Sequence, residues 1–471
     1  MSNLSGSDAS TFGNEMSKHE QRMELVKQRS IRNFEMLKLL EEENHPERDH
    51  AGTSKKSAKK KSSRAPRSGI HTNPDGHYMY VAYSRFSEHA RDVLQLCEHR
   101  TMPKPNSRSG QILVKILASS ISPTDCEIRR GEWSSIRLNP YIIPGAAFVG
   151  VVHEGSSDSK GRQLLSSNFK VGDYVMALRK HGGNARFIAV SRDNLVRVPQ
   201  HLDPHVVVCL AETYLTAFQA LHAGQRGNTR YRGDSLRGKS VLVLGGSSCL
   251  GRALIEVAVA GGADYCYALS KERQFDTIQQ VGGIPLPKDP QQWITLIGRQ
   301  IDMLMTVTDS NGLYSDHLTP DHLKAINESG HVVFIGPPGT TGRSPSVFSD
   351  STSPSPGKLI CKSMKTTVMD RSFSFNVFDS WDSDPKLCKR DLEHLVELLE
   401  QHRLEPAILE RVPLSKVAKV HSILETKKIP GFIVCSPWMT ESQLVPRQHQ
   451  QQQQHASVPQ NQQVYQHQYD L

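Results

Sequence analysis

The sequence has no closely spaced cysteines and no long apolar run. Its eight cysteines are scattered, and no two of them form a C-x-x-C pair. This spacing argues against a zinc ribbon or a disulfide framework and favours a reducing compartment. No apolar run reaches the ~18 residues of a membrane span, and the N-terminus lacks the hydrophobic core of a secretory signal. We therefore expect a cytoplasmic protein that does not engage a membrane.

Hydrophobic residues are also scarce for a chain of this length. They make up 37% of the 471 residues, and the mean hydropathy is -0.46. Such values indicate that part of the chain stays outside a folded core. Composition places that part at the two ends. We expect a basic N-terminal extension, disordered or helical, over residues 1–75, and a glutamine-rich disordered tail over residues 440–471.

The N-terminal extension carries a concentrated positive charge. Lys55 to Arg67 holds seven basic residues and no acid, in a chain of formal net charge +9. This tract suits nucleic acid or a protein partner such as an import receptor, and it allows a nuclear location. A solvated linker is the alternative. The tract has no interleaved aromatic residues for base stacking, which argues against nucleic-acid binding as the main function.

Two patterns of secondary structure divide the middle of the chain. Short strands separated by glycine turns, such as Gln111 to Ala118, predict a β-rich domain over residues 76–204. From 205 to 364, strands alternate with helices, which implies right-handed crossovers and a parallel, doubly wound sheet. Val206 to Ala223 and Asp321 to Glu328 are two of the expected helices.

A glycine turn opens this second region. Lys239 to Leu244 predicts a buried strand, Gly245 to Gly251 a turn, and Arg252 to Ala260 a helix. This order places backbone N–H groups and the positive end of a helix where a diphosphate could bind. The full fingerprint has a third glycine where Ser248 or Cys249 stands, so plain α/β architecture is the alternative.

Several stretches between residues 77 and 437 follow one another in a recognisable order. They include GQILVKILASSISPTDCEIRRGEW, IIPGAAFVGVV, FKVGDYVMAL, GGNARFIAV, LTAFQAL, KSVLVLGGSSCLG, ESGHVVFIG and PGFIV. In this order they resemble the medium-chain dehydrogenase/reductase superfamily, and in particular its zinc-free quinone oxidoreductase-like branch. The resemblance implies an α/β protein with a Rossmann-type doubly wound parallel sheet inserted in a β-rich GroES-like catalytic domain. Residues 365–439 would return to that catalytic domain.

The resemblance also bears on metal binding. In the zinc branch Gly-His-Glu follows the proline, whereas this chain has Pro144 followed by Gly145, Ala146 and Ala147. Alanine cannot ligate zinc, and a catalytic site needs about three convergent ligands. We therefore expect no metal site.

The cofactor implied by the resemblance is NADPH. Its diphosphate would lie on the glycine turn, and Thr216 and Gly336 would also approach the cofactor. After the second strand stand Ser270, Lys271 and Arg273, where an acid would favour NADH and cations favour a 2′-phosphate; ordinary surface charges are the alternative reading. The residues expected on the turn are Gly245, Gly246, Ser247, Ser248, Cys249, Leu250 and Gly251.

By the same resemblance, the reaction is hydride transfer to a quinone or an α,β-unsaturated carbonyl, and Ser122, Asp125 and Trp133 line the substrate cleft. Family members often have Asn at the position of Ser122 and Tyr at that of Trp133. Tyr141 is a candidate hydrogen-bond donor to the substrate, with a packing role as the alternative.

A second function stays open at this point. The altered glycine turn, Ser122 and the long extensions also fit an inactive member of the fold that acts as a scaffold for protein partners. The family commonly dimerises through the edge of the nucleotide-binding sheet, so a homodimer is a further expectation.

Overall fold

The computed structural model describes most of the chain between Tyr78 and Leu444. All the described residues belong to one structural unit, which begins at Ile70. The predicted N-terminal extension, with its basic tract, and most of the glutamine-rich tail lie outside them. The described ranges are 78–154, 169–223, 227–298, 300–307, 318–336, 372–427 and 429–444.

The β-rich part is built around strand β3 (Gln111–Ser120). Ile112, Val114 and Ile116 on one face of this strand are almost fully buried, as the alternating pattern predicts. Beside β3, antiparallel, run β4 (Ala147–Glu154) and β6 (Phe187–Ser191). The seven-stranded sheet has the order β14-β15-β3-β4-β5-β7, with β6 paired to β3, and β1 and β2 form a separate hairpin. The remaining strands of this part are β1 (Tyr78–Ala82), β2 (Gln95–His99), β5 (Tyr174–Leu178) and β7 (Val196–Arg197).

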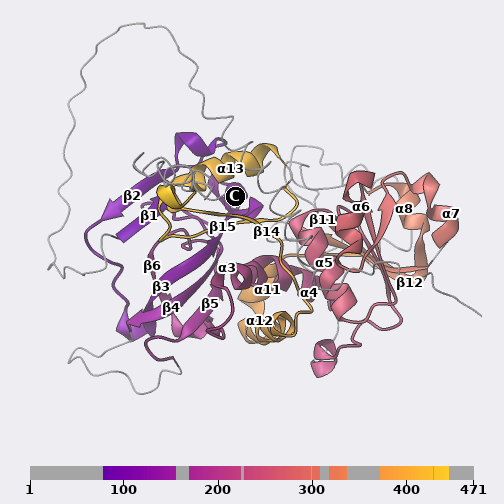
Figure 1. Ribbon diagram of the computed structural model, residues 1–471, viewed down its shortest axis with the longest axis horizontal. Helices are drawn as coiled ribbons and strands as arrows, with labels where there is room; N and C mark the ends of the chain where they lie inside the picture. The colour runs from indigo at the N-terminus through magenta and orange to yellow at the C-terminus, as the bar shows by residue number, and fades with distance from the viewer. Residues whose placement is uncertain are drawn as a thin grey trace, which may run out of the picture. The chain divides into compact units, whose positions relative to one another are not determined.

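The end of the chain returns to this sheet. Strand β15 (Phe432–Cys435) pairs antiparallel with β3, and β14 (Ile408–Val412) pairs parallel with β15. Figure 1 shows the yellow C-terminal segment beside the indigo and purple strands. The GroES-like part is therefore made of two stretches of sequence, as predicted.

Between these stretches lies a six-stranded sheet, parallel throughout, with the order β10-β9-β8-β11-β12-β13. The strand order reverses between β8 and β11, and ligands of such sheets bind in the crevice at the carboxyl ends beside this reversal. Its strands are β8 (Ser240–Val243), β9 (Tyr265–Ser270), β10 (Ile284–Pro287), β11 (Ile301–Val307), β12 (Ile326–Ile335) and β13 (Phe373–Phe375).

The parallel sheet continues beyond the boundary predicted at residue 364. Strand β13 pairs with β12 through Phe373 and Phe375, so it belongs to the nucleotide-binding part. Sequence composition did not show this because β13 has only three residues, too few for a recognisable period.

Two predicted helices differ in the structure. The expected helix from Val206 to Ala223 is interrupted: α3 (Pro204–Cys209) and α4 (Leu215–Leu221) are joined by a π-helical turn, Leu210–Tyr214. The helix predicted to end at Glu328 ends at Lys324, because β12 begins at Ile326 and pairs with β11. The other helices are α2 (Pro123–Arg130), α5 (Cys249–Ala260), α6 (Phe275–Gln279), α7 (Ile294–Ile297), α8 (Pro320–Lys324), α11 (Val377–Ser383), α12 (Pro385–Glu400) and α13 (Val417–Thr426).

Candidate functional site

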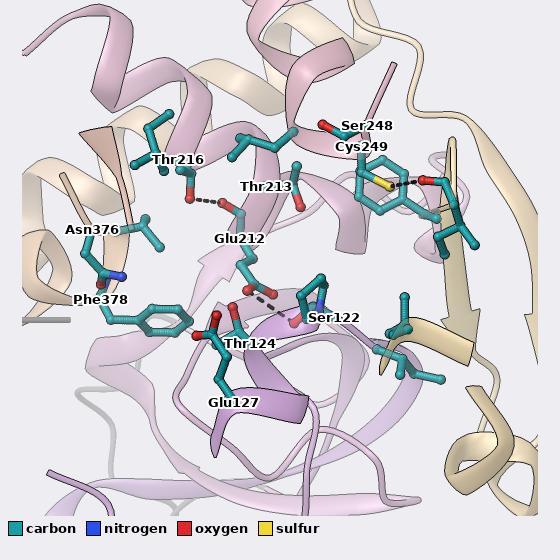
Figure 2. Close-up of a pocket in the computed structure, with 18 of the residues that line it drawn as sticks. Ser122, Thr124, Glu127, Glu212, Thr213, Thr216, Ser248, Cys249, Asn376 and Phe378 are labelled. Carbon is teal, nitrogen blue, oxygen red and sulfur yellow. Dashed lines mark hydrogen bonds between the residues drawn. The ribbon is translucent and has the colours of Figure 1, made fainter. Parts of the chain in front are cut away.

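A pocket of about 180 Å³ lies between the parallel sheet and the GroES-like part. The nucleotide-binding side contributes the start of α5 and the ends of β12 and of the segment before α11, while α2 and the β15 region form the opposite wall (Figure 2). Its lining residues include Ser122, Thr124, Glu127, Trp133, Glu212, Thr213, Thr216, Ser248, Cys249, Leu250, Gly336, Asn376, Phe378 and Gly431.

The turn between β8 and α5 depends on its glycines. Gly245 has φ 76°, a left-handed conformation that favours glycine. A Cβ on Gly251 would lie 2.2 Å from the carbonyl oxygen of Gly245, and one on Gly246 would lie 2.6 Å from the Cβ of Ala268. Because glycine has no Cβ at these positions, α5 can approach the strand closely, with its N-terminus at the carboxyl edge of the sheet.

The two residues that replace glycine in this turn have structural partners. Ser248 caps α5: its Oγ accepts a hydrogen bond from the Gly251 N–H at 3.0 Å and donates to the carbonyl of Gly245 at 2.9 Å. The Sγ of Cys249 lies 3.0 Å from the carbonyl oxygen of Gly431. The turn is therefore ordered by its own side chains and linked to the opposite wall.

A glutamate from the π-helical turn enters the pocket. Glu212 is 9% exposed, and Oγ of Ser122 donates a hydrogen bond to its Oε1 at 3.3 Å; Figure 2 shows the carboxyl group reaching towards Ser122. Its other oxygen, Oε2, has no hydrogen-bond partner among the described residues. Burial, and then the charge of Asp125, raise the pKa of Glu212 to about 7.

Ser122 and Asp125 form the start of α2. Oδ2 of Asp125 accepts the Ser122 N–H at 2.9 Å and lies 3.3 Å from the Ser122 Oγ, a capping box that fixes both side chains. Oδ1 of Asp125 accepts the N–H of Gly145 at 2.7 Å. Burial raises the pKa of Asp125 to about 6, although these donors favour the charged form.

Two aromatic rings form one side of the pocket. Trp133 and Phe378 meet edge to face, with ring centroids 5.1 Å apart. The indole N–H of Trp133 donates to Glu127 at 3.1 Å. Asn376 caps α11 and donates from Nδ2 to the carbonyl of Gly336 at 2.7 Å, which holds Phe378 beside the end of β12.

Within the described residues, no group of three His, Cys, Asp or Glu side chains could hold a metal ion. A Cys–His contact, Cys126 Sγ to His421 Nδ1 at 3.6 Å, is buried. Burial raises the pKa of this cysteine to about 12 and lowers that of the histidine to about 3, so both are neutral and packed.

None of the helices in the described part of the chain is long and apolar enough to cross a membrane.

Comparisons with known proteins agree with this architecture. Residues 108–200 match the family model for the alcohol dehydrogenase GroES-like domain. Mouse quinone oxidoreductase is 27% identical over 254 residues, covering 52% of this chain and 70% of the mouse protein. The spinach chloroplastic quinone-oxidoreductase homolog is 25% identical over 350 residues, covering 72% and 94%. These similarities support assignment of the chain to the quinone oxidoreductase-like branch of the medium-chain dehydrogenase/reductase superfamily.

Further similar proteins include one more sequence and two solved structures. Tomato 2-methylene-furan-3-one reductase is 27% identical over 354 residues, covering 74% of this chain and 76% of the tomato protein. The solved quinone oxidoreductase of Coxiella burnetii superposes with a TM-score of 0.57 at 20% identity, covering 77% of this chain and 99% of that chain. A mycobacterial protein solved with NADPH shares the fold, with a TM-score of 0.57 at 18% identity, covering 76% of this chain and 100% of that chain.

The pocket brings together most of the predicted cleft residues. Ser122, Trp133, Thr216 and Gly336 line it, with Ser248, Cys249 and Leu250 from the turn. Gly245, Gly246, Ser247 and Gly251 form the rest of that turn. The Oγ1 of Thr216 donates to the backbone carbonyl of Glu212 at 2.7 Å.

Two predicted catalytic residues do not line the pocket. Asp125 is buried behind Ser122. Tyr141 is 42% exposed and stacks on Tyr80 at 5.7 Å. Its neighbour Ile142 pairs with Tyr83, which holds Tyr141 on the β1 side of the molecule. Tyr141 therefore lies outside this pocket, and its stacking on Tyr80 fits the packing role that was its alternative.

The predicted 2′-phosphate residues lie at the end of β9. Lys271 and Arg273 are exposed, whereas Ser270 is buried and its hydroxyl donates to the carbonyl of Lys271 at 3.3 Å. The Gly246 N–H donates to the carbonyl of Leu269 at 3.1 Å, so the end of β9 adjoins the glycine turn.

Sequence reasoning missed Glu212, Asn376 and Phe378. Glu212 gave one usable signal, because it is a single carboxyl group inside the apolar run VVVCLAETYLTAF. An acid within such a run is either paired or functional. Asn376 and Phe378 stand next to a segment whose sequence had no recognisable pattern.

Proposed function

We propose that this chain is an NADPH-dependent oxidoreductase that reduces a quinone or an α,β-unsaturated carbonyl without a metal ion. The observation that carries this proposal is a single pocket that joins the start of α5, at the reversal of the parallel sheet, to polar and aromatic side chains of the GroES-like part. Both halves of a hydride-transfer site are thus present in one cavity.

The glycine turn fits the cofactor's diphosphate. Gly245, Gly246 and Gly251 leave room that a Cβ would fill, and the first N–H groups of a helix lack intrahelical acceptors. Thr216 and Gly336 line the same pocket and would flank the nicotinamide. Bound NADPH would supply a hydride, while the protein would position the substrate and exclude water.

The exposed Lys271 and Arg273 support NADPH rather than NADH. They follow β9, at the position where an acidic side chain would hold the ribose 2′-OH of NADH. Two cations there suit a 2′-phosphate through charge-assisted hydrogen bonds.

The pocket favours an uncharged substrate. Among the described residues its lining holds two glutamates and no lysine, arginine or histidine, together with the rings of Trp133 and Phe378. A substrate with a carboxylate or phosphate near the reacting carbon would meet no compensating cation. A neutral enone or quinone would bury its apolar surface without this cost.

A fluorescence titration tests the proposal. We expect the wild type to shift nicotinamide fluorescence with NADPH more tightly than with NADH. Gly251→Ala should lose this binding, because its Cβ would meet the Gly245 carbonyl at 2.2 Å. Gly233→Ala is a matched control, because its nearest contact is 3.6 Å away, and it should bind as the wild type does.

A scaffold without catalytic activity is the second candidate. The N–H of Gly251 already donates a hydrogen bond to the Ser248 hydroxyl, so it is not open to a diphosphate. The thiol of Cys249 faces Gly431 rather than the turn. Absence of NADPH binding by the folded wild type at millimolar cofactor would favour this candidate. Deletion of residues 1–69 or 445–471 would then abolish partner recruitment.

A further inference from the structure

A carboxyl group rarely lies inside an apolar pocket without an ionic partner. Glu212 does so here: it is 9% exposed, and none of the lining residues that the structure describes is a cation. A buried, unpaired carboxylate is costly, whereas a neutral carboxylic acid needs only hydrogen bonds. The surroundings of Glu212 therefore suit its protonated form.

The hydrogen bonds around Glu212 distinguish its two oxygens. Ser122 donates its hydroxyl to Oε1, so this oxygen acts as the acceptor. Oε2 is buried and accepts no well-formed hydrogen bond from the described residues, although the Thr124 hydroxyl lies close enough to the carboxyl group to favour its ionised form. The proton of a neutral Glu212 is accordingly best placed on Oε2, as a donor that awaits an acceptor.

Ser122 is itself held in place. Its N–H is bonded to Asp125, whose second oxygen accepts the N–H of Gly145. The Oγ of Ser122 lies 3.3 Å from both Asp125 Oδ2 and Glu212 Oε1. Because a hydroxyl has one proton and Asp125 already accepts two backbone donors, Ser122 is able to direct its proton to Glu212.

The backbone that carries Glu212 has an unusual helical conformation. Leu210–Tyr214 is a π-helical turn inside an otherwise α-helical segment, and such turns occur frequently at functional sites. The Thr216 hydroxyl bonds the carbonyl of Glu212 at 2.7 Å and so satisfies one of the backbone acceptors of the turn.

We propose that Glu212 is the acid that protonates the reduced substrate, and that Ser122 and Asp125 position its carboxyl group. This inference rests on the proposed function. When an enone accepts a hydride at its β-carbon, the electron pair of the C=C bond forms an enolate. The O–H bond at Oε2 then breaks, the proton bonds to the α-carbon, and Glu212 is left as a carboxylate that water reprotonates.

The charged neighbours of Glu212 bear on its pH dependence. Asp125 disfavours its ionised form, and the hydroxyls of Ser122 and Thr124 favour that form. On α5, which packs against the π-helical turn, Arg252 and Glu256 pair with each other at 3.3 Å. Titratable groups on the adjoining elements include Asp125 and Glu127 on α2, Cys249, Arg252 and Glu256 on α5, Tyr214 beside Glu212, and Asp391 on α12.

Two glutamate-to-glutamine substitutions make a matched experiment. Glu212→Gln keeps the size of the side chain and cannot donate this proton. Glu410→Gln is the control, because Glu410 lies outside the pocket on β14 and burial also raises its pKa to about 7. Infrared titration of the cofactor-free proteins should show that each variant loses one carboxyl group that titrates near neutral pH.

Catalysis should then separate the two variants. With NADPH and 2-methylcyclohex-2-enone, whose α-carbon becomes a stereocentre, the wild type and Glu410→Gln should give one enantiomer. Glu212→Gln should lose on the order of 100-fold in kcat, the usual contribution of a general acid, and give both enantiomers. Its circular dichroism spectrum should match that of the wild type.

A third variant tests the positioning role. Ser122→Ala removes a hydrogen bond that favours the ionised form of Glu212, so the fall in kcat with rising pH should move to higher pH. An unchanged pH profile and product stereochemistry in Glu212→Gln would overturn this inference alone. Failure of the wild type to bind NADPH would overturn the proposed function and this inference with it.

Discussion

The thiol of Cys249 lies 3.0 Å from the carbonyl oxygen of Gly431. The first residue begins α5 in the nucleotide-binding part, and the second precedes β15 in the GroES-like part. Burial raises the pKa of this thiol to about 12, so it stays protonated and can donate. The contact therefore joins the two parts directly beside the pocket.

Replacing Cys249 should show how much this contact stabilises the fold. We expect Cys249→Ala to lower the free energy of unfolding by about 1 kcal/mol, the usual net contribution of one buried hydrogen bond. Cys249→Ser keeps a donor and should lose less. Urea unfolding of the three proteins measures the difference, and equal losses in both variants would show that the thiol does not donate to Gly431.

The stability of the wild type should depend on Glu212 and pH. Its pKa is raised from 4.5 to about 7 in the folded chain, so the folded state binds the proton more tightly than the unfolded state. Its contribution to the free energy of unfolding therefore falls as pH rises from about 4.5 to 7. The free energy of unfolding of Glu212→Gln, measured relative to that of the wild type, should therefore rise by about 3 kcal/mol between pH 4 and pH 8. Parallel pH dependences of the two unfolding free energies would contradict this expectation.

Cofactor preference should change with the two cations after β9. We expect the double variant Lys271→Ala, Arg273→Ala to bind NADPH at least 10-fold more weakly, since each charge-assisted hydrogen bond contributes about 1.5–3 kcal/mol. Binding of NADH, which has no 2′-phosphate, serves as the internal control and should change little. Titration of each cofactor by fluorescence measures both values, and equal losses for NADPH and NADH would contradict the assignment.

Phe378 should limit the size of the substrate. Its ring meets Trp133 at 5.1 Å on one side of the pocket, so Phe378→Ala opens space there. We expect kcat/KM to rise for a bulkier enone relative to a small one. The variant should also lose about 3–5 kcal/mol of stability, as buried aromatic truncations do. Steady-state kinetics with the two substrates tests the first expectation. That expectation fails if the ratio of the two kcat/KM values is the same in the variant and the wild type.

The sequence was informative wherever burial and local pattern coincide. The strand predicted from Gln111 to Ala118 is β3, Gln111–Ser120, and the strand predicted from Lys239 to Leu244 is β8, Ser240–Val243, because each is an apolar run next to a turn. Strand β10 was not expected, since Pro285 and Pro287 remove backbone donors. The strand is possible because it lies at the edge of the sheet and pairs only with β9.

The pocket could be predicted only in part. Ser122, Trp133 and Thr216 were found through the family resemblance, whereas Glu212 and Phe378 lack a motif that marks them. These two residues are 166 positions apart in the sequence, and the fold alone brings them into one cavity. Tyr141 illustrates the opposite case, because this polar aromatic residue was expected in the pocket and stacks on Tyr80 of β1 instead.

The chemistry of the pocket depends on the number of residues in the π-helical turn. An α-helix turns by about 100° per residue, so deletion of one residue between Leu210 and Tyr214 would rotate the helix before it against the helix after it. The packing of α3 against β3 and the packing of α4 against α5 would then be incompatible, and the Glu212 carboxyl group would leave its place in the pocket. A single-codon deletion at this place would change the polarity of the pocket without replacing any of the residues that line it from other elements.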